Sequence, residues 1–262
     1  MIRALYTAAS GMSAQQANLD TVANNLANSA TVGFRSRRLQ FEDMIYQNMV
    51  VPGSAQTEQT QSEGLQIGLG TKSAASEVIM TQGDFSQTGN PLDLAIQGAG
   101  FFQVSMPDGT IAYTRAGNFQ KNNQGLLVTS DGNTVLPAIT IPSNATSVTI
   151  SKYGVVSATI PGQTNPAQLG TIQLATFANP GGLNSVGSNL FMATDSSGNP
   201  ITDTPGGTSG MGTLQEGYTE NSNVDVVGEF VQMILAQRAY ESNSKVVHVA
   251  DEMYSDINDL VR

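Results

Sequence analysis

The chain has 262 residues, a net charge of −10 and no cysteine. The acidic balance argues against a nucleic-acid-binding protein, because few cations are available to neutralise phosphates, and the lack of cysteine excludes disulfides and thiolate metal sites. No run approaches the roughly eighteen consecutive apolar residues of a membrane-spanning helix, so no membrane insertion is expected.

The first thirty residues have the periodicity of a packed helix. Two sets of residues recur every seven positions, three residues apart, as in a coiled coil. The first set is Leu5, Met12, Leu19 and Leu26, and the second is Ile2, Ala9, Gln16 and Ala23. An ordinary amphipathic helix packed on a globular domain is the alternative, since Ala9 and Gln16 are weak knobs. Gln15, Asn18 and Asp20 interrupt any apolar stretch of a secretory signal, so no cleaved leader is expected.

Residues 31–73 are predicted to form an extended arm. Asn28 to Thr31 are expected to end the helix, and Gly33 to adopt a left-handed turn. Leu65, Ile67 and Leu69 alternate as in a strand, although a disordered, low-complexity loop is the alternative for residues 44–73.

Three arginines, Arg35, Arg37 and Arg38, follow the first helix and are interpreted as a basic rim facing an acidic helix. Residues 1–43 carry four basic and three acidic side chains, whereas residues 216–262 carry three basic and nine acidic ones. Opposite signs suit ends that meet, within one chain or between chains.

Residues 74–220 are predicted to be an antiparallel, β-rich body. Short alternating runs are separated by turn signals such as Asp108-Gly109 and Asp131-Gly132. The runs are 92–96, 101–104, 111–114, 126–128, 148–150, 155–160 and 172–177. Residues 184–212, rich in Ser, Gly, Asn, Asp and Thr, are interpreted as a long surface loop.

Residues 221–262 repeat the seven-residue pattern. One set is Met233, Tyr240, Val247, Tyr254 and Val261, and the other is Ala236, Asn243, Ala250 and Ile257. Ser222 or Asn223 is expected to cap the helix, and Asp225 favours the positive end of its dipole. A helix from about residue 224 to residue 260 is roughly 55 Å long. That length needs a partner helix, which the first thirty residues supply, and the fold class is therefore α+β: paired terminal coiled-coil helices, an extended arm and an antiparallel all-β body.

No catalytic, cofactor-binding or metal site is predicted. His248 is the only histidine and falls beside Val247, so neither a zinc site nor a Ser-His-Asp site is expected. Asp251 and Glu252 are interpreted as part of a solvated helix face, and residues 195–199 as a turn that lacks calcium-loop spacing.

Both ends of the chain resemble the bacterial flagellar rod and hook proteins. The stretches that carry the resemblance are 10–14, 19–28 and 31–35 at the N-terminus, and 222–226, 237–245 and 250–253 at the C-terminus. Residues 90–102 and 113–119 are similar to central motifs of the same family. Segment 44–73 is similar to an insertion in the family's distal rod members, where it contacts neighbouring subunits and stiffens the tube.

The resemblance implies a structural subunit, not an enzyme, that polymerises helically into the distal rod, with its terminal helices lining the tube. The rod crosses the periplasm and transmits torque from motor to hook. The implied partners are further copies of the chain, proximal rod proteins, the hook protein and the surrounding P- and L-ring bushing. Export is implied to use the flagellar type III apparatus, without a cleaved signal peptide.

Four segments are predicted: an N-terminal assembly helix (1–30), an arm with a distal-rod-type insertion (31–73), a β-rich body (74–220) and a C-terminal assembly helix (221–262) that pairs with the first. The predicted subunit-interface residues are Leu5, Met12, Leu19, Leu26, Arg35, Arg37, Arg38, Met233, Tyr240, Val247 and Tyr254. Because the helices offer little apolar area, both are expected to be marginal in the free monomer and to order on assembly.

Two alternatives stay open on the sequence alone. One is a proximal rod or hook subunit of the same family. The other is a periplasmic cell-wall hydrolase, which would need an acid–base pair of carboxyl groups in a cleft.

Overall fold

The computed structural model describes residues 2–50, 55–56, 59–60, 64–163 and 165–260. The chain divides into two compact units, each built from segments far apart in the sequence. Unit 1 takes Met1–Ala27, Arg37–Val78 and Asp225–Arg262, and unit 2 takes Asn28–Ser36 and Ile79–Val224. The α+β class is confirmed, because two long helices accompany strands that pair antiparallel.

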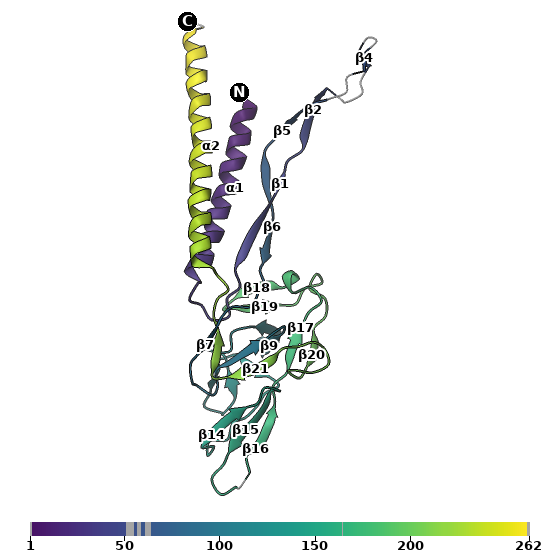
Figure 1. The fold of residues 1–262 in the computed structure, drawn as a ribbon, viewed down its shortest axis with the longest axis vertical. Helices are drawn as coiled ribbons and strands as arrows, with labels where there is room; N and C mark the ends of the chain where they lie inside the picture. Colours follow the sequence, from purple (N-terminus) through teal and green to yellow (C-terminus); the bar gives the residue numbers. More distant parts are fainter. Residues whose placement is uncertain (1, 51–54, 57–58, 61–63, 164, 261–262) are drawn as a thin grey trace. The chain divides into compact units, whose positions relative to one another are not determined.

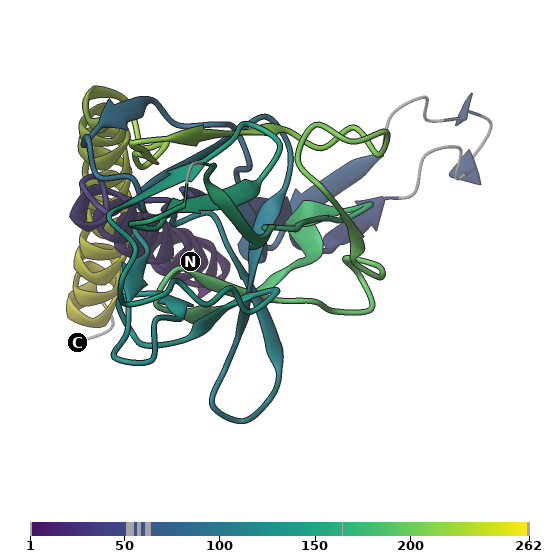
Figure 2. The ribbon, with the colours of Figure 1, turned by 90° about the horizontal axis from the view of Figure 1, so that it is seen from below.

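Unit 1 contains two helices that lie side by side, α1 (Ile2–Ala27) and α2 (Val226–Leu260) (Figure 1, Figure 2). Small residues allow the helices to approach closely. A side chain added at Gly11 would come within 2.8 Å of the Asn243 amide nitrogen of α2. Ala14, Ala236 and Ala250 are buried.

The second row of residues predicted for α1 is wrong. Ala9, Gln16 and Ala23 are exposed, whereas Ala8 and Val22, one position earlier in each case, are buried. The row that contains Leu5 can form a seven-residue repeat with a second row either three positions before it or three positions after it. Both flanking rows mix apolar residues with a glutamine, Gln16 in one and Gln15 in the other, so the pattern does not determine which side faces the partner helix.

The predicted rows of α2 match its packed face more closely. Ala236 and Ala250 are buried, Met233, Asn243, Val247 and Tyr254 are partly buried, and Tyr240 and Ile257 are exposed.

The cap predicted for α2, Ser222 or Asn223, is wrong. The Val227 amide donates to the Asp225 carboxylate at 3.1 Å, so Asp225 begins the helix, while the Asn223 side chain bonds to other backbone segments. Val261 lies outside the described residues.

The arm of unit 1 is a two-stranded antiparallel ribbon (Figure 1). Its paired strands are β1 (Arg37–Asp43) with β6 (Thr71–Val78), β2 (Tyr46–Val50) with β5 (Leu65–Gly68), and β3 (Ala55–Gln56) with β4 (Gln59–Thr60). Strands β1 and β6 both contact α1. The strand predicted from Leu65 is therefore present. Residues 51–54, 57–58 and 61–63 of the predicted insertion lie outside the described residues.

Unit 2 consists mainly of short strands with a single 3-10 turn among its described elements. They are β7 (Phe85–Gln87), β8 (Leu94–Gln97), β9 (Phe101–Ser105), β10 (Ile111–Thr114), β11 (Gln120–Lys121), β12 (Leu127–Val128), β13 (Thr134–Leu136), β14 (Ser147–Ile150), β15 (Val155–Thr159), β16 (Ala167–Thr171), β17 (Leu174–Thr176), η1 (Pro180–Gly182), β18 (Asn184–Gly187), β19 (Leu190–Met192), β20 (Ile201–Asp203), β21 (Thr213–Glu216) and β22 (Tyr218–Glu220). Strand β9 is central, since it pairs with β10, β13 and β17. Strands β14, β15 and β16 form a separate sheet.

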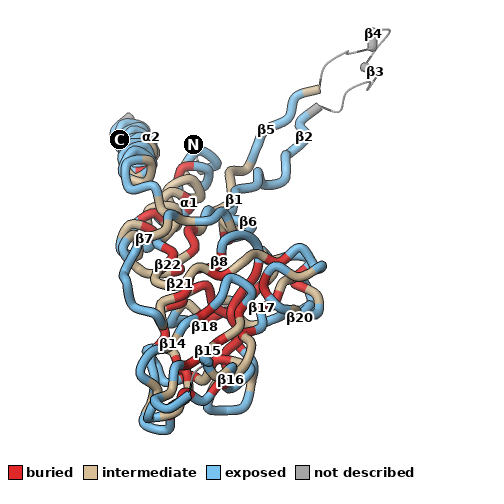
Figure 3. The backbone as a smooth tube through the Cα atoms, turned by 60° about the horizontal axis from the view of Figure 1, so that its bottom comes forward, coloured by how far each residue is buried: buried red, intermediate tan, exposed pale blue. Residues whose placement is uncertain are grey.

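The core of unit 2 forms where the predicted apolar runs become strands. Leu94, Phe102, Ile172 and Leu174 have no exposed surface, and Figure 3 shows that β8 and β17 are mostly buried whereas much of α2 is exposed. The prediction that 184–212 is one surface loop is wrong, because β18, β19 and β20 lie in it and both β19 and β20 pair with other strands of the sheet. Only a short apolar run marks β19 in a segment of small polar residues, too little to predict a strand.

Candidate functional site

Helix α2 carries large apolar side chains on a face that the described chain does not cover. We call this the outer face of α2. It consists of Val227, Phe230, Val231, Ile234, Leu235, Val246, Val249 and Met253, all of which are exposed. A helix that packs against its own chain normally turns charged or polar residues to water on its other side. An apolar outer face indicates a surface that another molecule covers.

The first stretch of the outer face, which holds Val227, Phe230, Val231 and Ile234, lies opposite the face that packs on α1. At 3.6 residues per turn, Ile234 and Ala236 are separated by a little more than half a turn; Ile234 is 56% exposed and Ala236 is 3% exposed. Arg238 and Lys245 interrupt the outer face at its middle, so it consists of two apolar stretches. Helix α2 is therefore built to bury two opposite sides.

The predicted interface residues lie mostly on the inner side of the helix pair. Leu5, Met12, Leu19 and Leu26 are all partly buried in unit 1. Sequence reasoning missed the outer face because it followed one seven-residue repeat in each helix. The signal was present in the run from Val226 to Leu235, where apolar residues occupy both sides of two successive turns.

A buried asparagine joins the elements of unit 1. Asn25 of α1 is 1% exposed. Its amide nitrogen donates to the Arg37 carbonyl at 2.8 Å and to the Glu229 carboxylate of α2 at 2.9 Å, and its amide oxygen accepts from the Arg37 N–H at 2.9 Å. Burial raises the pKa of the Glu229 carboxyl, and the bond from Asn25 opposes that rise. One side chain thus couples α1, the first residue of the arm and α2.

The three arginines predicted to form a basic rim have separate environments. The Arg37 backbone pairs with Asn25, as described above. Arg38 is exposed and forms a 3.0 Å ion pair with Glu77 across the ribbon. That pair holds the pKa of the Glu77 carboxyl below its ordinary value, with help from Gln40. Exposed ion pairs of this kind contribute little to stability, because water and salt screen them.

Arg35 is buried inside unit 2, so it does not form part of an exposed basic rim. Its guanidinium donates to the Glu220 carboxylate at 2.6 Å, and both side chains are almost fully buried, at 2% and 0% exposed. Arg115 donates to the other carboxylate oxygen at 2.9 Å. The Gly83 N–H also donates to Glu220, at 3.0 Å. A buried charge needs such partners, which explains why the arginine nearest the first helix turns inward.

Arg115 also donates hydrogen bonds to backbone carbonyl groups. It donates to the carbonyls of Ile96, Gly98 and Gly100. Burial lowers its pKa to about 10, and the Glu220 charge opposes that change. The sequence could have singled out Arg115, because it is the only arginine between Arg38 and Arg238 and directly follows the strand-forming run 111–114.

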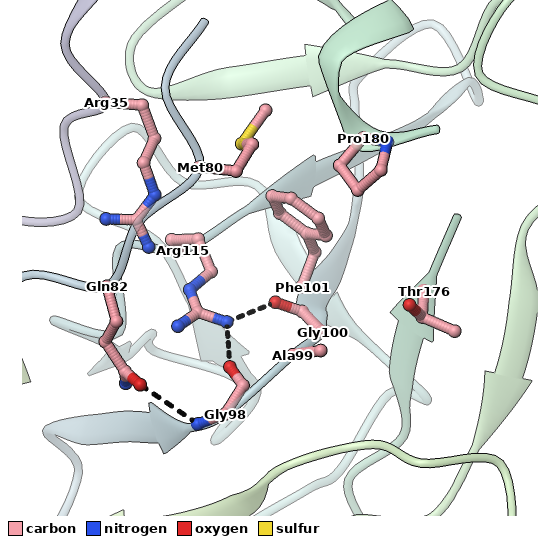
Figure 4. Close-up of a pocket in the computed structure, with 10 residues that line it drawn as sticks. All are labelled: Arg35, Met80, Gln82, Gly98, Ala99, Gly100, Phe101, Arg115, Thr176 and Pro180. Carbon is pink, nitrogen blue, oxygen red and sulfur yellow. Dashed lines mark hydrogen bonds between the residues drawn. The ribbon is translucent and has the colours of Figure 1, made fainter. Parts of the chain in front are cut away.

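A cavity of about 230 Å³ lies beside this cluster in unit 2 (Figure 4). Arg35, Arg115 and Gln82 line it together with apolar side chains such as Met80 and Phe101. Gln82 and Arg115 bond to backbone groups at its wall. No carboxylate, histidine or serine is among the lining residues, so the cavity does not offer the acid–base pair that a cell-wall hydrolase needs.

Within the part of the chain that the structure describes, no three His, Asp or Glu side chains are grouped to hold a metal ion. Neither helix of this part combines the length and apolarity needed to cross a membrane.

Comparisons with known proteins agree on one family. The model described as "Flagella basal body rod protein" matches residues 5–35, the model for the "Flagellar hook protein FlgE/F/G D1 domain" matches 95–158, and the model for the "Flagellar basal body rod FlgEFG protein C-terminal" matches 215–260. The flagellar basal-body rod protein FlgG of Caulobacter vibrioides is 49% identical over 254 residues, which is 96% of this chain and 97% of that protein. The proteins of the same name from Borreliella burgdorferi and Bacillus subtilis are 48% and 42% identical, with all of both chains covered.

Proposed function

The chain belongs to the flagellar basal-body rod protein family, and we propose that its copies polymerise helically into the distal rod, the drive shaft that transmits torque from the motor to the hook. It is a structural subunit of the flagellar basal body, and the family is not enzymatic. The observation that carries the proposal of polymerisation is that α2 is apolar on two opposite sides.

The two sides of α2 pack against different partners. The inner side packs on α1, and the pair behaves as a coiled coil completed by its neighbours. The outer face of α2 packs against helices of adjacent copies. Burying a large apolar side chain stabilises by about 1.5–3 kcal/mol, so a face of this size supplies a substantial driving force for assembly.

The arm supports the distal assignment. A two-stranded ribbon is marginally stable alone in water, and this one exposes Phe41, Ile45, Tyr46, Met49 and Leu65. These side chains are the contacts through which the arm joins neighbouring subunits and stiffens the tube.

The finer assignments of place and partners belong to the same proposal. The rod spans the periplasm, adjoins proximal rod proteins and the hook protein, and turns within the P- and L-ring bushing. The subunit leaves the cytoplasm through the flagellar type III apparatus. The relatives are named as flagellar basal-body rod proteins, which supports a place in the basal body.

Electron microscopy of the concentrated full-length protein tests the proposal. We expect tubular or helical assemblies, together with no release of fragments from purified cell wall in a parallel assay. A protein that stays monomeric at high concentration and releases cell-wall fragments would favour the hydrolase and refute the proposal.

The contribution of the arm is tested by making its exposed side chains polar. The double variant Ile45→Ser, Met49→Ser should fold as the parent does, because both side chains are exposed, but should build rods that bend more easily. The readout is the curvature of isolated rods in electron micrographs. Ile201→Ser is the matched control, because Ile201 of unit 2 is as exposed as Met49, at 53% and 52%. Equal curvature in both variants would show that the arm does not stiffen the rod.

A further inference from the structure

Two short segments of unit 2 adjoin the terminal helices in the sequence. Residues 28–36 follow α1 directly, and residues 219–224 end just before Asp225 caps α2. Although nearly 190 positions separate them in the sequence, these segments bond directly to each other: the Gly33 N–H donates to the Glu220 carbonyl at 2.8 Å, and the Ser36 N–H donates to the Asn223 amide oxygen at 2.7 Å. The chain that leaves α1 and the chain that enters α2 are therefore neighbours in unit 2.

Side chains reinforce this backbone contact on both sides. The buried Arg35–Glu220 pair links the two segments, and Arg115 and Gly83 attach Glu220 to the rest of unit 2. The Asn223 amide nitrogen donates to the Ile79 and Thr81 carbonyls at 2.9 and 3.1 Å.

Two more contacts anchor the segments at their other ends. The Asn189 amide donates to the Val32 carbonyl at 2.9 Å, and the Asn221 N–H donates to the Asp84 carbonyl at 2.8 Å. Gly33 has a φ of +70°, and a side chain there would come within 2.5 Å of the Ala116 backbone nitrogen. The segment after α1 is thus seated against the backbone of unit 2 at a position that requires glycine.

We infer that residues 32–36 and 220–223 form a clamp that stays closed in the free subunit and marks where the ordering of the terminal helices begins. Opening the clamp would remove Arg35 from the buried Glu220 carboxylate and the Gly33 N–H from the Glu220 carbonyl, which opposes opening. A closed clamp also keeps the chain after α1 beside the chain before α2. Tethering two segments in this way lowers the entropic cost of bringing them together. Ordering of α1 and α2 therefore starts at Asn25 and Glu229 and proceeds toward the two termini.

This inference concerns the free subunit and does not depend on helical polymerisation, so it can fail while the proposed function holds. Amide hydrogen exchange on the dilute, full-length monomer tests it. The amides of Gly33, Ser36 and Asn221 should exchange at least about 100-fold more slowly than in an unfolded chain, because exchange requires breaking a buried cluster. Within α1 and α2, protection should fall from the clamp toward the termini.

Variants assign the protection to the clamp. Glu220→Gln should raise the exchange rates of the three amides about tenfold or more, while β9 and β10 keep theirs. If Glu220→Gln unfolds unit 2 as a whole, Asn223→Ala carries the same test at the Ser36 amide. Glu77→Gln, which removes only an exposed ion pair, is the control and should change none of these amides.

Two results would overturn the inference. One is exchange of the Gly33, Ser36 and Asn221 amides at unfolded-chain rates in the parent monomer. The other is unchanged protection of those amides in both Glu220→Gln and Asn223→Ala, which would mean that the named side chains do not hold the segments together.

Discussion

Replacing Ile234 by aspartate should abolish rod assembly and motility while leaving the free subunit folded. Ile234 is 56% exposed in the single chain, so the change costs the monomer little. The proposed assembly packs the same position against a neighbouring copy, where an unpaired charge would be penalised by several kcal/mol. The penalty recurs at every subunit of the polymer.

The measurements are swarming on soft agar, electron microscopy of basal bodies and circular dichroism of the purified monomer. Gln237→Asp is the matched control, because it adds the same charge one turn further along α2 at a position that is already polar and exposed. Normal rods in the Ile234→Asp strain would show that the outer face of α2 is not an assembly surface.

Replacing Glu220 by alanine should destabilise unit 2 more than any change to a surface ion pair. The substitution leaves Arg35 and Arg115, whose side chains are 2% and 5% exposed, without their shared carboxylate. Removing one partner of a buried ion pair costs about 3–5 kcal/mol of the free energy of unfolding. Two cations would then face each other in the interior, which adds repulsion to the loss.

Urea denaturation of the monomer, followed by circular dichroism because the chain has no tryptophan, measures the effect. Glu77→Ala is the comparison, since Glu77 and Arg38 are 43% and 66% exposed. Its expected cost is much smaller, because water and salt screen an exposed ion pair. Similar midpoints for the two variants would mean that the buried cluster contributes little to the stability of unit 2.

Periodic, uninterrupted sequence patterns predicted the elements of this fold well. The terminal helices follow from seven-residue repeats in proline-free ends, and runs such as 101–104 and 111–114 become β9 and β10. Ala236 and Ala250 of α2 are also buried as predicted. These features are local, because the spacing of apolar residues within one element determines which side is buried.

The features that were missed depend on contacts between distant parts of the chain. Arg35 was interpreted as a surface residue because its partner, Glu220, lies 185 positions away. Asn25 gave no sign that it would bind the backbone of Arg37. The outer face of α2 was missed for a different reason, since a single repeat was taken to describe the whole helix. The contacts of Arg35 and Asn25 depend on tertiary structure, and the spacing of residues within one segment does not encode them.

The two asparagines and the buried glutamate share a physical role. Each satisfies backbone or charged groups where the chain passes from one unit to the other, at residues 36–37 and 224–225. Backbone polar groups at such crossings lack the regular partners that helices and sheets provide. Asn25 supplies those partners in unit 1, and Asn223 and Glu220 supply them in unit 2.

A cryo-electron microscopy reconstruction of the basal-body rod, from cells in which this chain is the only source of the protein, tests the central claim most directly. The account predicts that the outer face of α2 is buried between copies, with Ile234 and Leu235 within about 4 Å of apolar atoms of a neighbouring helix. A rod in which Val227 to Leu235 face open solvent, or a rod that does not contain this chain, would contradict it.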